Sequence, residues 1–228
     1  MTGDKKNIID VRNIDHYDIN HTLEIMLQAD YGSHYIIVYP DLFTLRRIYS
    51  NYSKIQLENK NDIVLLLPFY ETTESVRKIL SGGCHDAISS LDIGKNEKNG
   101  SLVIVDSKKA YFGSKTIVDI KTFVGMLIEH AKHSQKTGVC VIADMGAFFY
   151  FNKIQELVKY ETTLPPQFDL NLKAFCCYHK SDFGNYLTRE QDHNLLHHHG
   201  KAMITKTTPS TNLLFTNSNA SETVKFGL

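Results

Sequence analysis

Short apolar runs alternate along the chain with stretches in which apolar residues recur every three or four positions. The runs have the length of strands and the stretches have the period of helices. The pattern therefore predicts an α/β protein in which a mainly parallel sheet lies between two layers of helices. The expected strands are residues 34–39, 62–68, 102–106, 139–144 and 172–178.

Helices are expected between these strands. Within residues 42–55, Leu45, Ile48 and Tyr52 recur on one face, as in an amphipathic helix of about four turns. Further helices are expected at residues 71–80, 118–133, 152–164 and 182–198, with a short packed helix before residue 32. The polar segment 94–100 (GKNEKNG) is rich in turn residues and predicts a surface loop.

The composition divides the chain into three parts. Residues 1–31 are polar with scattered apolar positions, residues 32–204 carry the alternating pattern, and residues 205–228 are rich in Thr, Ser and Asn. The last part has little apolar surface to bury beyond Leu213 and its neighbours. It is therefore expected to be a flexible tail with one edge strand near Leu213.

The charge balance limits the classes of partner. Lys and Arg number 25, Asp and Glu also number 25, and the formal net charge is zero. The basic excess typical of a nucleic-acid-binding protein is therefore missing. The apolar runs are too short to span a membrane, and Met1 leads into a polar segment rather than an apolar leader, which predicts a cytoplasmic protein.

Candidate chemistry gathers where the strands end, because open parallel sheets bind ligands at the carboxyl ends of their strands. Tyr39 and Asp41 follow the first expected strand, Glu71 the second, Asp144 the fourth and Tyr178 the fifth. The carboxylates could together hold a divalent cation or orient a water molecule. Taken singly, Asp41 and Glu71 are better explained as a helix cap and a first-turn acid.

A nucleotide-binding loop is missing from its expected place. A P-loop needs GxxxxGK[ST] between a strand and a helix. The turn after the first strand instead reads VYPDLFT, in which Pro40 lacks an N–H and Asp41 adds a negative charge. The segment 110–116 (AYFGSKT) does not have the required spacing either.

The cysteines and the late histidines do not form a known metal motif. Without CxxC spacing, four cysteines are expected to be reduced and structural: Cys84, Cys140, Cys176 and Cys177. His193 and His197 are four residues apart, as in some metal sites, but no HExxH accompanies them and a solvated helix end is expected. A catalytic pair of Cys176 with His179 lacks a third group to orient the base.

Five short motifs follow one another in the alternating region. They are GxH at the first strand (Gly32, His34), Tyr at its end (Tyr39), YExxL in a helix (Tyr160, Glu161, Leu164), Tyr ending the last central strand (Tyr178) and a late LLxxH (Leu195, Leu196, His199). In this order and spacing they resemble the MEDS (methanogen/methylotroph sensory) domain, a degenerate branch of the KaiC/RecA-like fold. The resemblance covers about residues 32–204.

This resemblance implies a RecA/KaiC-like three-layer α/β/α fold and a sensory role in signal transduction. It also implies small hydrocarbon-derived or one-carbon ligands, which are proposed for some members. Compared with KaiC-like ATPases, Asp144 falls at the Walker B position and Glu71 near the catalytic glutamate. The missing P-loop departs from that pattern and argues against ATP hydrolysis. Gly200 also departs, since members often have Pro after the late His.

Three functions remain as hypotheses. We favour a non-enzymatic cytoplasmic sensory domain without a cofactor, in which a degenerate nucleotide cleft binds a small molecule or a signalling protein. The alternatives are a weak ATPase that binds ATP and Mg²⁺, and an oligomeric scaffold. The expected ligand-lining residues are His34, Tyr39, Asp41, Glu71, Asp144, Glu161, Tyr178 and His199. Glu161 could instead be structural, through a buried charge-assisted hydrogen bond with His199.

Overall fold

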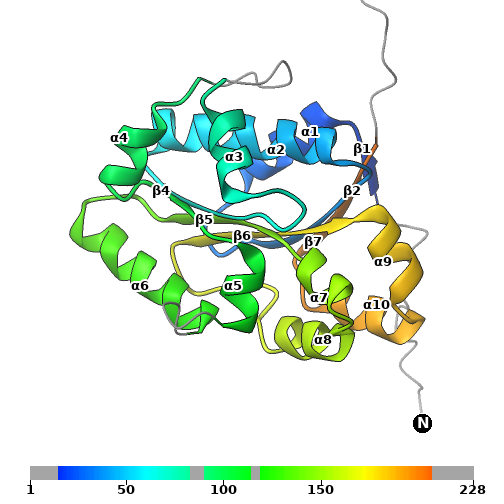
Figure 1. Cartoon of the computed structure of the whole chain (residues 1–228). Helices are drawn as coiled ribbons and strands as arrows, with labels where there is room; N and C mark the ends of the chain where they lie inside the picture. Colours follow the sequence, from blue (N-terminus) through cyan, green and yellow to red (C-terminus); the bar gives the residue numbers. More distant parts are fainter. Residues whose placement is uncertain (1–14, 83–89, 114–118, 207–228) are drawn as a thin grey trace, which may run out of the picture.

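A computed structural model describes residues 15–82, 90–113 and 119–206 of the chain (Figure 1). In it, seven strands form one sheet in the order β1-β7-β2-β6-β5-β3-β4, and each neighbouring pair is parallel. The strands are β1 (Asp15–Tyr17), β2 (His34–Tyr39), β3 (Ile63–Leu67), β4 (Leu102–Ile104), β5 (Val139–Asp144), β6 (Leu172–His179) and β7 (Lys201–Thr205).

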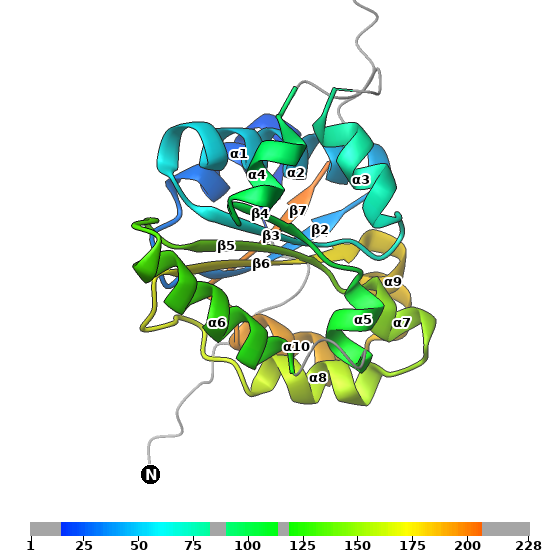
Figure 2. The ribbon, with the colours of Figure 1, turned by 60° about the vertical axis from the view of Figure 1, so that its left-hand side comes forward.

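Helices cover both faces of the sheet, α1 to α4 on one and α5 to α10 on the other (Figures 1 and 2). They are α1 (Ile19–Gln28), α2 (Leu42–Ile55), α3 (Thr73–Leu80), α4 (Ile93–Lys98), α5 (Ser107–Phe112), α6 (Ile120–His133), α7 (Gly146–Tyr150), α8 (Ile154–Thr162), α9 (Lys180–Tyr186) and α10 (Arg189–His197). This is the three-layer α/β/α architecture of a RecA-like fold, as the sequence predicts.

The two helical layers enclose separate halves of the core. Successive strand residues point to opposite faces of a sheet. In β2, Ile36 and Val38 accordingly pack with α5 to α10, whereas Ile37 and Tyr39 pack with α1 to α3. Strands β2, β3, β5 and β6 are largely buried on both faces, which explains why their sequences are nearly continuous apolar runs.

The prediction of a surface loop at residues 94–100 is wrong, because α4 occupies most of this segment. Asp92 caps this helix by accepting a hydrogen bond from the backbone N–H of Lys95 at 2.9 Å. Glu97, on the helix, accepts one from Arg77 Nε at 2.8 Å. A cap and one ion pair are sufficient to fold a polar segment that carries no apolar stripe.

The single helix expected over residues 182–198 is also wrong in part. Two helices, α9 and α10, occupy the region and are separated at Leu187, whose backbone is extended. Thr188 then begins α10 with a capping box in which Thr188 and Gln191 bond each other's backbone N–H. The capping box at Thr188 therefore begins a second helix inside the segment that was predicted to be a single helix.

Besides α4, several elements were not predicted: the strands β1 and β7, the helices α5 and α7, and a π-helical turn (Gln56–Lys60) that continues α2. The two strands are short and partly polar, with the sequences DHY and KAMIT. Cys140, Cys176 and Cys177 are buried and free, as predicted. Three other predictions concern residues outside the described part of the chain: the state of Cys84, the end of the segment 110–116, and the strand near Leu213. No helix in the described part of the chain is long and apolar enough to cross a membrane.

Candidate functional site

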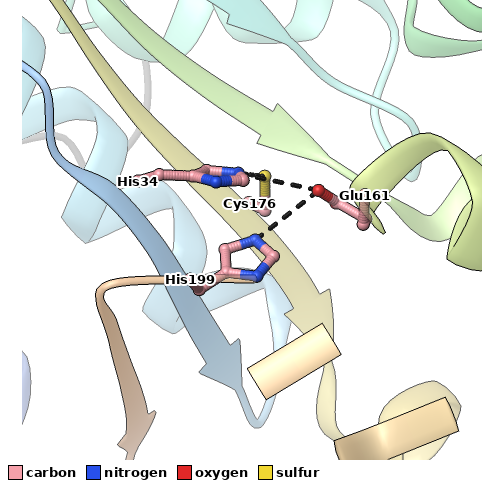
Figure 3. A group of neighbouring side chains, drawn as sticks. All are labelled: His34, Glu161, Cys176 and His199. Atoms are coloured by element: carbon pink, nitrogen blue, oxygen red, sulfur yellow. Dashed lines mark hydrogen bonds and ion pairs between the residues drawn. The ribbon is translucent and has the colours of Figure 1, made fainter. Parts of the chain in front are cut away.

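The eight expected ligand-lining residues lie in two separate places. Tyr39, Asp41, Glu71 and Asp144 lie at or near the carboxyl ends of β2, β3 and β5. On the side of the sheet covered by α5 to α10, Glu161 lies beside His34 and His199 (Figure 3), and Tyr178 bonds the Glu161 carboxylate. His34 and Tyr39 are five residues apart in β2 and therefore face opposite sides of the sheet.

Two acids of the edge group have structural roles. Asp41 caps α2 by accepting a hydrogen bond from the backbone N–H of Thr44 at 2.8 Å, as predicted. Glu71 accepts hydrogen bonds from Arg46 Nε at 2.8 Å and from the Tyr49 hydroxyl at 3.2 Å. Arg46 and Tyr49 both belong to α2, so this acid ties the α2 helix to the end of β3; the Ser75 hydroxyl of α3 also donates to it, at 3.3 Å.

Asp144 ends β5 and is buried beneath the same edge. Its carboxylate accepts hydrogen bonds from the backbone N–H of Gly146 at 2.9 Å and from the Tyr39 hydroxyl at 3.2 Å. Burial raises the pKa of Asp144 to about 7, although these donors favour the charged form and oppose the rise. Asp144 is therefore about half protonated in the folded protein at neutral pH.

The raised pKa of Asp144 predicts how stability depends on pH. Its folded pKa of about 7 lies above the unfolded value near 4, so the stabilising contribution of its proton is complete below pH 4 and is lost as pH rises through 7. Asp144→Asn should abolish a fall of about 3 kcal/mol in the free energy of unfolding between pH 5 and pH 8. Chemical denaturation of both proteins at the two pH values measures this. An equal change in the free energy of unfolding in the wild type and in Asp144→Asn would contradict the prediction.

Three residues of the second group form a cluster with Cys176, and all four side chains are buried (Figure 3). The cluster consists of His34 at the start of β2, Glu161 in α8, Cys176 in β6 and His199 between α10 and β7. His34 Nδ1 lies 3.0 Å from the carbonyl oxygen of Pro165, and His199 Nδ1 lies 2.6 Å from that of Leu195. A carbonyl oxygen only accepts, so these contacts place a proton on each Nδ1. Each Nε2 then faces the cluster.

Glu161 lies between the two imidazoles. Its Oε1 accepts a hydrogen bond from the Tyr178 hydroxyl at 2.7 Å, and its Oε2 lies 3.5 Å from His199 Nε2 and 3.6 Å from His34 Nε2. The predicted pairing of Glu161 with His199 is thus present, but as a contact longer than a charge-assisted hydrogen bond. Among the described residues, no hydrogen-bond donor reaches Glu161 Oε2 or His199 Nε2.

The charges in this cluster follow from burial and from the neighbouring groups. Burial lowers the pKa of His199 to about 4, so this ring is neutral at pH 7. Burial alone would raise the pKa of the Glu161 carboxyl, but the positive charge available to His199 and His34 and the hydrogen bond from the Tyr178 hydroxyl together hold it below its ordinary value. Glu161 is therefore ionised inside the protein.

Cys176 is the member of the cluster that sequence reasoning missed. Its Sγ lies 3.6 Å from His34 Nε2, because residues 36 and 176 are paired in the β2–β6 ladder. The expected alternative partner, His179, instead contacts the Ser181 hydroxyl at 2.6 Å. The signal available in the sequence was strand alternation, which puts Cys176 on the same face as Tyr178.

The backbone around Gly32 fixes the position of His34. Gly32 has a φ of 93°, and a Cβ there would lie 2.6 Å from the carbonyl oxygen of Phe168. Only glycine adopts this conformation without strain and permits so close an approach. Gly32 also accepts a hydrogen bond from the Phe168 N–H at 2.8 Å, and Gly200 N–H donates to the His34 carbonyl at 2.8 Å. These bonds bring the chain on either side of the cluster together.

A pocket of about 450 Å³ lies against the cluster, between the sheet and the helices α6 and α8. Figure 2 shows these two helices beneath β5 and β6. The apolar part of its wall includes Ile120, Val124, Ile128, Val141, Phe168 and Leu172. His34 and Cys176 belong to the wall on the cluster side, while the exposed residues Lys121, Asp169 and Leu170 line its outer part. The pocket therefore connects the surface with the buried cluster.

Fold and site together define a RecA-like α/β/α protein. Its buried cluster and its pocket lie on the side of the sheet that α5 to α10 cover, and not at the carboxyl edge of the sheet. Comparison with known proteins finds no matching family model and no matching curated protein. The assignment of a function therefore depends on the geometry of the site. Four of the five motifs that resemble the MEDS domain contribute a residue to the cluster or lie directly beside it: Gly32 and His34, Glu161, Tyr178, and His199. The fifth, Tyr39, lies on the opposite face of the sheet and bonds Asp144.

Proposed function

We propose that this chain is a non-enzymatic cytoplasmic sensory domain that binds a small, mostly apolar molecule in the pocket beneath α6 and α8. The observation that carries the proposal is the pocket itself. Its volume of about 450 Å³ lies in the usual range for small-molecule sites, and its wall is mostly apolar with few polar groups. An apolar body with one polar end fits this distribution.

The size of the pocket favours one of the two ligand classes that the MEDS resemblance implies. A one-carbon compound would leave most of about 450 Å³ unfilled and would contact little of the apolar wall. A hydrocarbon chain or ring carrying a hydroxyl or carbonyl group would cover that wall. Its polar end would be able to hydrogen-bond with the Tyr111 and Tyr160 hydroxyl groups, which also line the pocket.

The edge of the sheet gives less support to nucleotide binding. The first turn of α2 is capped by the Asp41 carboxylate, which places negative charge where an ATP phosphate would bind. Glu71, the acid expected near the catalytic position, is instead paired with Arg46. Asp144 alone keeps the position expected of a Walker B residue.

A titration distinguishes the three candidate functions. Thermal denaturation and calorimetry of the full chain are followed with hexanol, octanol, cyclohexanol and benzyl alcohol, with methanol as the one-carbon control, and with ATP and Mg²⁺. We expect saturable binding and a raised Tm with the larger alcohols only. A Mg²⁺-dependent rise with ATP that Asp144→Ala abolishes would favour the nucleotide alternative, and no response to any compound would favour a scaffold.

A further inference from the structure

We infer that His34, Glu161, Cys176 and His199 form a binding site for a divalent transition metal of the Zn²⁺ type. This inference goes beyond the proposed function and does not depend on it. Four potential ligand atoms, one from each residue, all lie within 4.8 Å of one another, and all four residues are buried. No other group of three or more such residues is found in the part of the chain that the structure describes.

Three of the distances between potential ligand atoms fit metal ligands better than hydrogen-bond partners, and the whole set lies within 4.8 Å. Glu161 Oε2 lies 3.5 Å and 3.6 Å from the two Nε2 atoms, and Cys176 Sγ lies 3.6 Å from His34 Nε2. Hydrogen bonds to a carboxylate are shorter, about 2.7–2.9 Å. Ligand atoms at tetrahedral Zn²⁺ are separated by about 3.3–3.6 Å, given Zn–N and Zn–O distances near 2.0–2.2 Å and Zn–S near 2.3 Å.

The orientation of the rings also fits a metal. Both Nδ1 atoms contact backbone carbonyl oxygens, so both Nε2 lone pairs and the Glu161 Oε2 atom point at the same small volume. Among the described residues, Glu161 Oε2 and His199 Nε2 have no hydrogen-bond partner, and His34 Nε2 has only the weak thiol donor of Cys176. Acceptors that face one another in this way are unfavourable in a buried place. A cation at their centre would satisfy all three, and carbonyl partners at Nδ1 are the arrangement typical of metal-binding histidines.

The remaining requirements of such a site are met as well. Tyr178 donates a hydrogen bond to the other oxygen of the Glu161 carboxylate and fixes its orientation. Zn²⁺ would displace the thiol proton of Cys176 to solvent, and the thiolate and carboxylate would together balance the charge of the ion. The pocket lined by His34 and Cys176 provides a route from the surface. Four protein ligands complete the coordination, which indicates a structural rather than a catalytic ion.

The ion is tested on the full chain after treatment with a chelator. Zn²⁺ is titrated by calorimetry, and Co²⁺ is followed by absorption, because tetrahedral Co²⁺ has intense d–d bands and a Cys thiolate adds a charge-transfer band. We expect one equivalent to bind, the Tm to rise and the thiolate band to appear. Absence of saturable binding, or a Co²⁺ spectrum without the thiolate band, would overturn the inference irrespective of how any variant folds.

Two matched controls locate the site. Cys176→Ala should abolish the charge-transfer band and weaken Zn²⁺ binding at least tenfold, whereas Cys177→Ala removes a buried thiol on the opposite face and should bind as the wild type does. His193→Ala with His197→Ala removes the late pair, whose rings stack 6.3 Å apart on α10, and should also leave binding unchanged. Equal binding by Cys176→Ala and Cys177→Ala, or loss only in the histidine double variant, would place the metal elsewhere.

Discussion

Replacing Gly125 with Phe is expected to abolish the binding of octanol while leaving the protein at least as stable as the wild type. Gly125 lies within α6 and lines the pocket, and a Cβ built there meets no described atom within 4 Å. A phenyl ring at this position would therefore occupy the space that the ligand needs. Because Gly is less favourable than other residues in a helix by up to about 1 kcal/mol, the change should not weaken α6.

Gly184 provides the matched control for this variant. It also lies in a helix, α9, and a Cβ there also meets no described atom within 4 Å, but Gly184 is exposed and is not part of the pocket wall. Gly184→Phe should therefore bind octanol with the affinity of the wild type. Calorimetric titration of the three proteins measures the difference, and octanol binding by Gly125→Phe at wild-type affinity would show that the ligand lies elsewhere.

Glu161→Ala is expected to reduce the free energy of unfolding by about 3–5 kcal/mol, measured by urea denaturation in the presence of a chelator. The Glu161 carboxylate is fully buried, and the Tyr178 hydroxyl donates its hydrogen bond to it. Its removal leaves the Tyr178 hydroxyl without an acceptor and opens a cavity beside two imidazoles. These costs add, because no described neighbour replaces the carboxylate.

The control lies on the same helix. Glu156 is exposed and pairs with Lys153 at 2.7 Å on the surface of α8, so Glu156→Ala should change the free energy of unfolding by less than about 0.5 kcal/mol. A loss of similar size in both variants would mean that the helix, rather than the cluster, is responsible. Repeating the comparison with Zn²⁺ should widen the difference between the variants, because Glu156→Ala keeps all four proposed ligands and would gain stability from binding the ion, as the wild type would, whereas Glu161→Ala lacks one of them.

The parts of the fold that were predicted correctly are those whose burial is complete. β3 and β5 are buried on both faces, and their runs IVLLL and VCVIAD stand out from the helical periods around them. β1 and β7 lie toward the edge of the sheet and retain polar residues, so their sequences do not differ from those of loops. Strand order was not predictable, because it depends on pairing between distant segments.

For the site, residue types were predicted better than their arrangement. His34, Glu161 and His199 were identified, but they were placed with Tyr39 and Asp144 in one cleft at the carboxyl edge. Strand alternation alone separates His34 from Tyr39. In contrast, the meeting of Glu161 with His199 depends on how α8 and α10 pack beneath the sheet, which no local pattern determines.

The central claim, that the ligand site lies beneath α6 rather than at the carboxyl edge, is tested most directly by methyl NMR spectra of the full chain during titration with octanol. The account predicts shifts for Val124, Ile128 and Val141, which line the pocket, and none for Leu45 and Val76, which line the small depression beside Glu71 and Asp144. Octanol-induced shifts confined to Leu45 and Val76 would contradict this prediction. So would shifts of Leu45 and Val76 on addition of ATP and Mg²⁺ that are larger than the shifts octanol produces in the pocket.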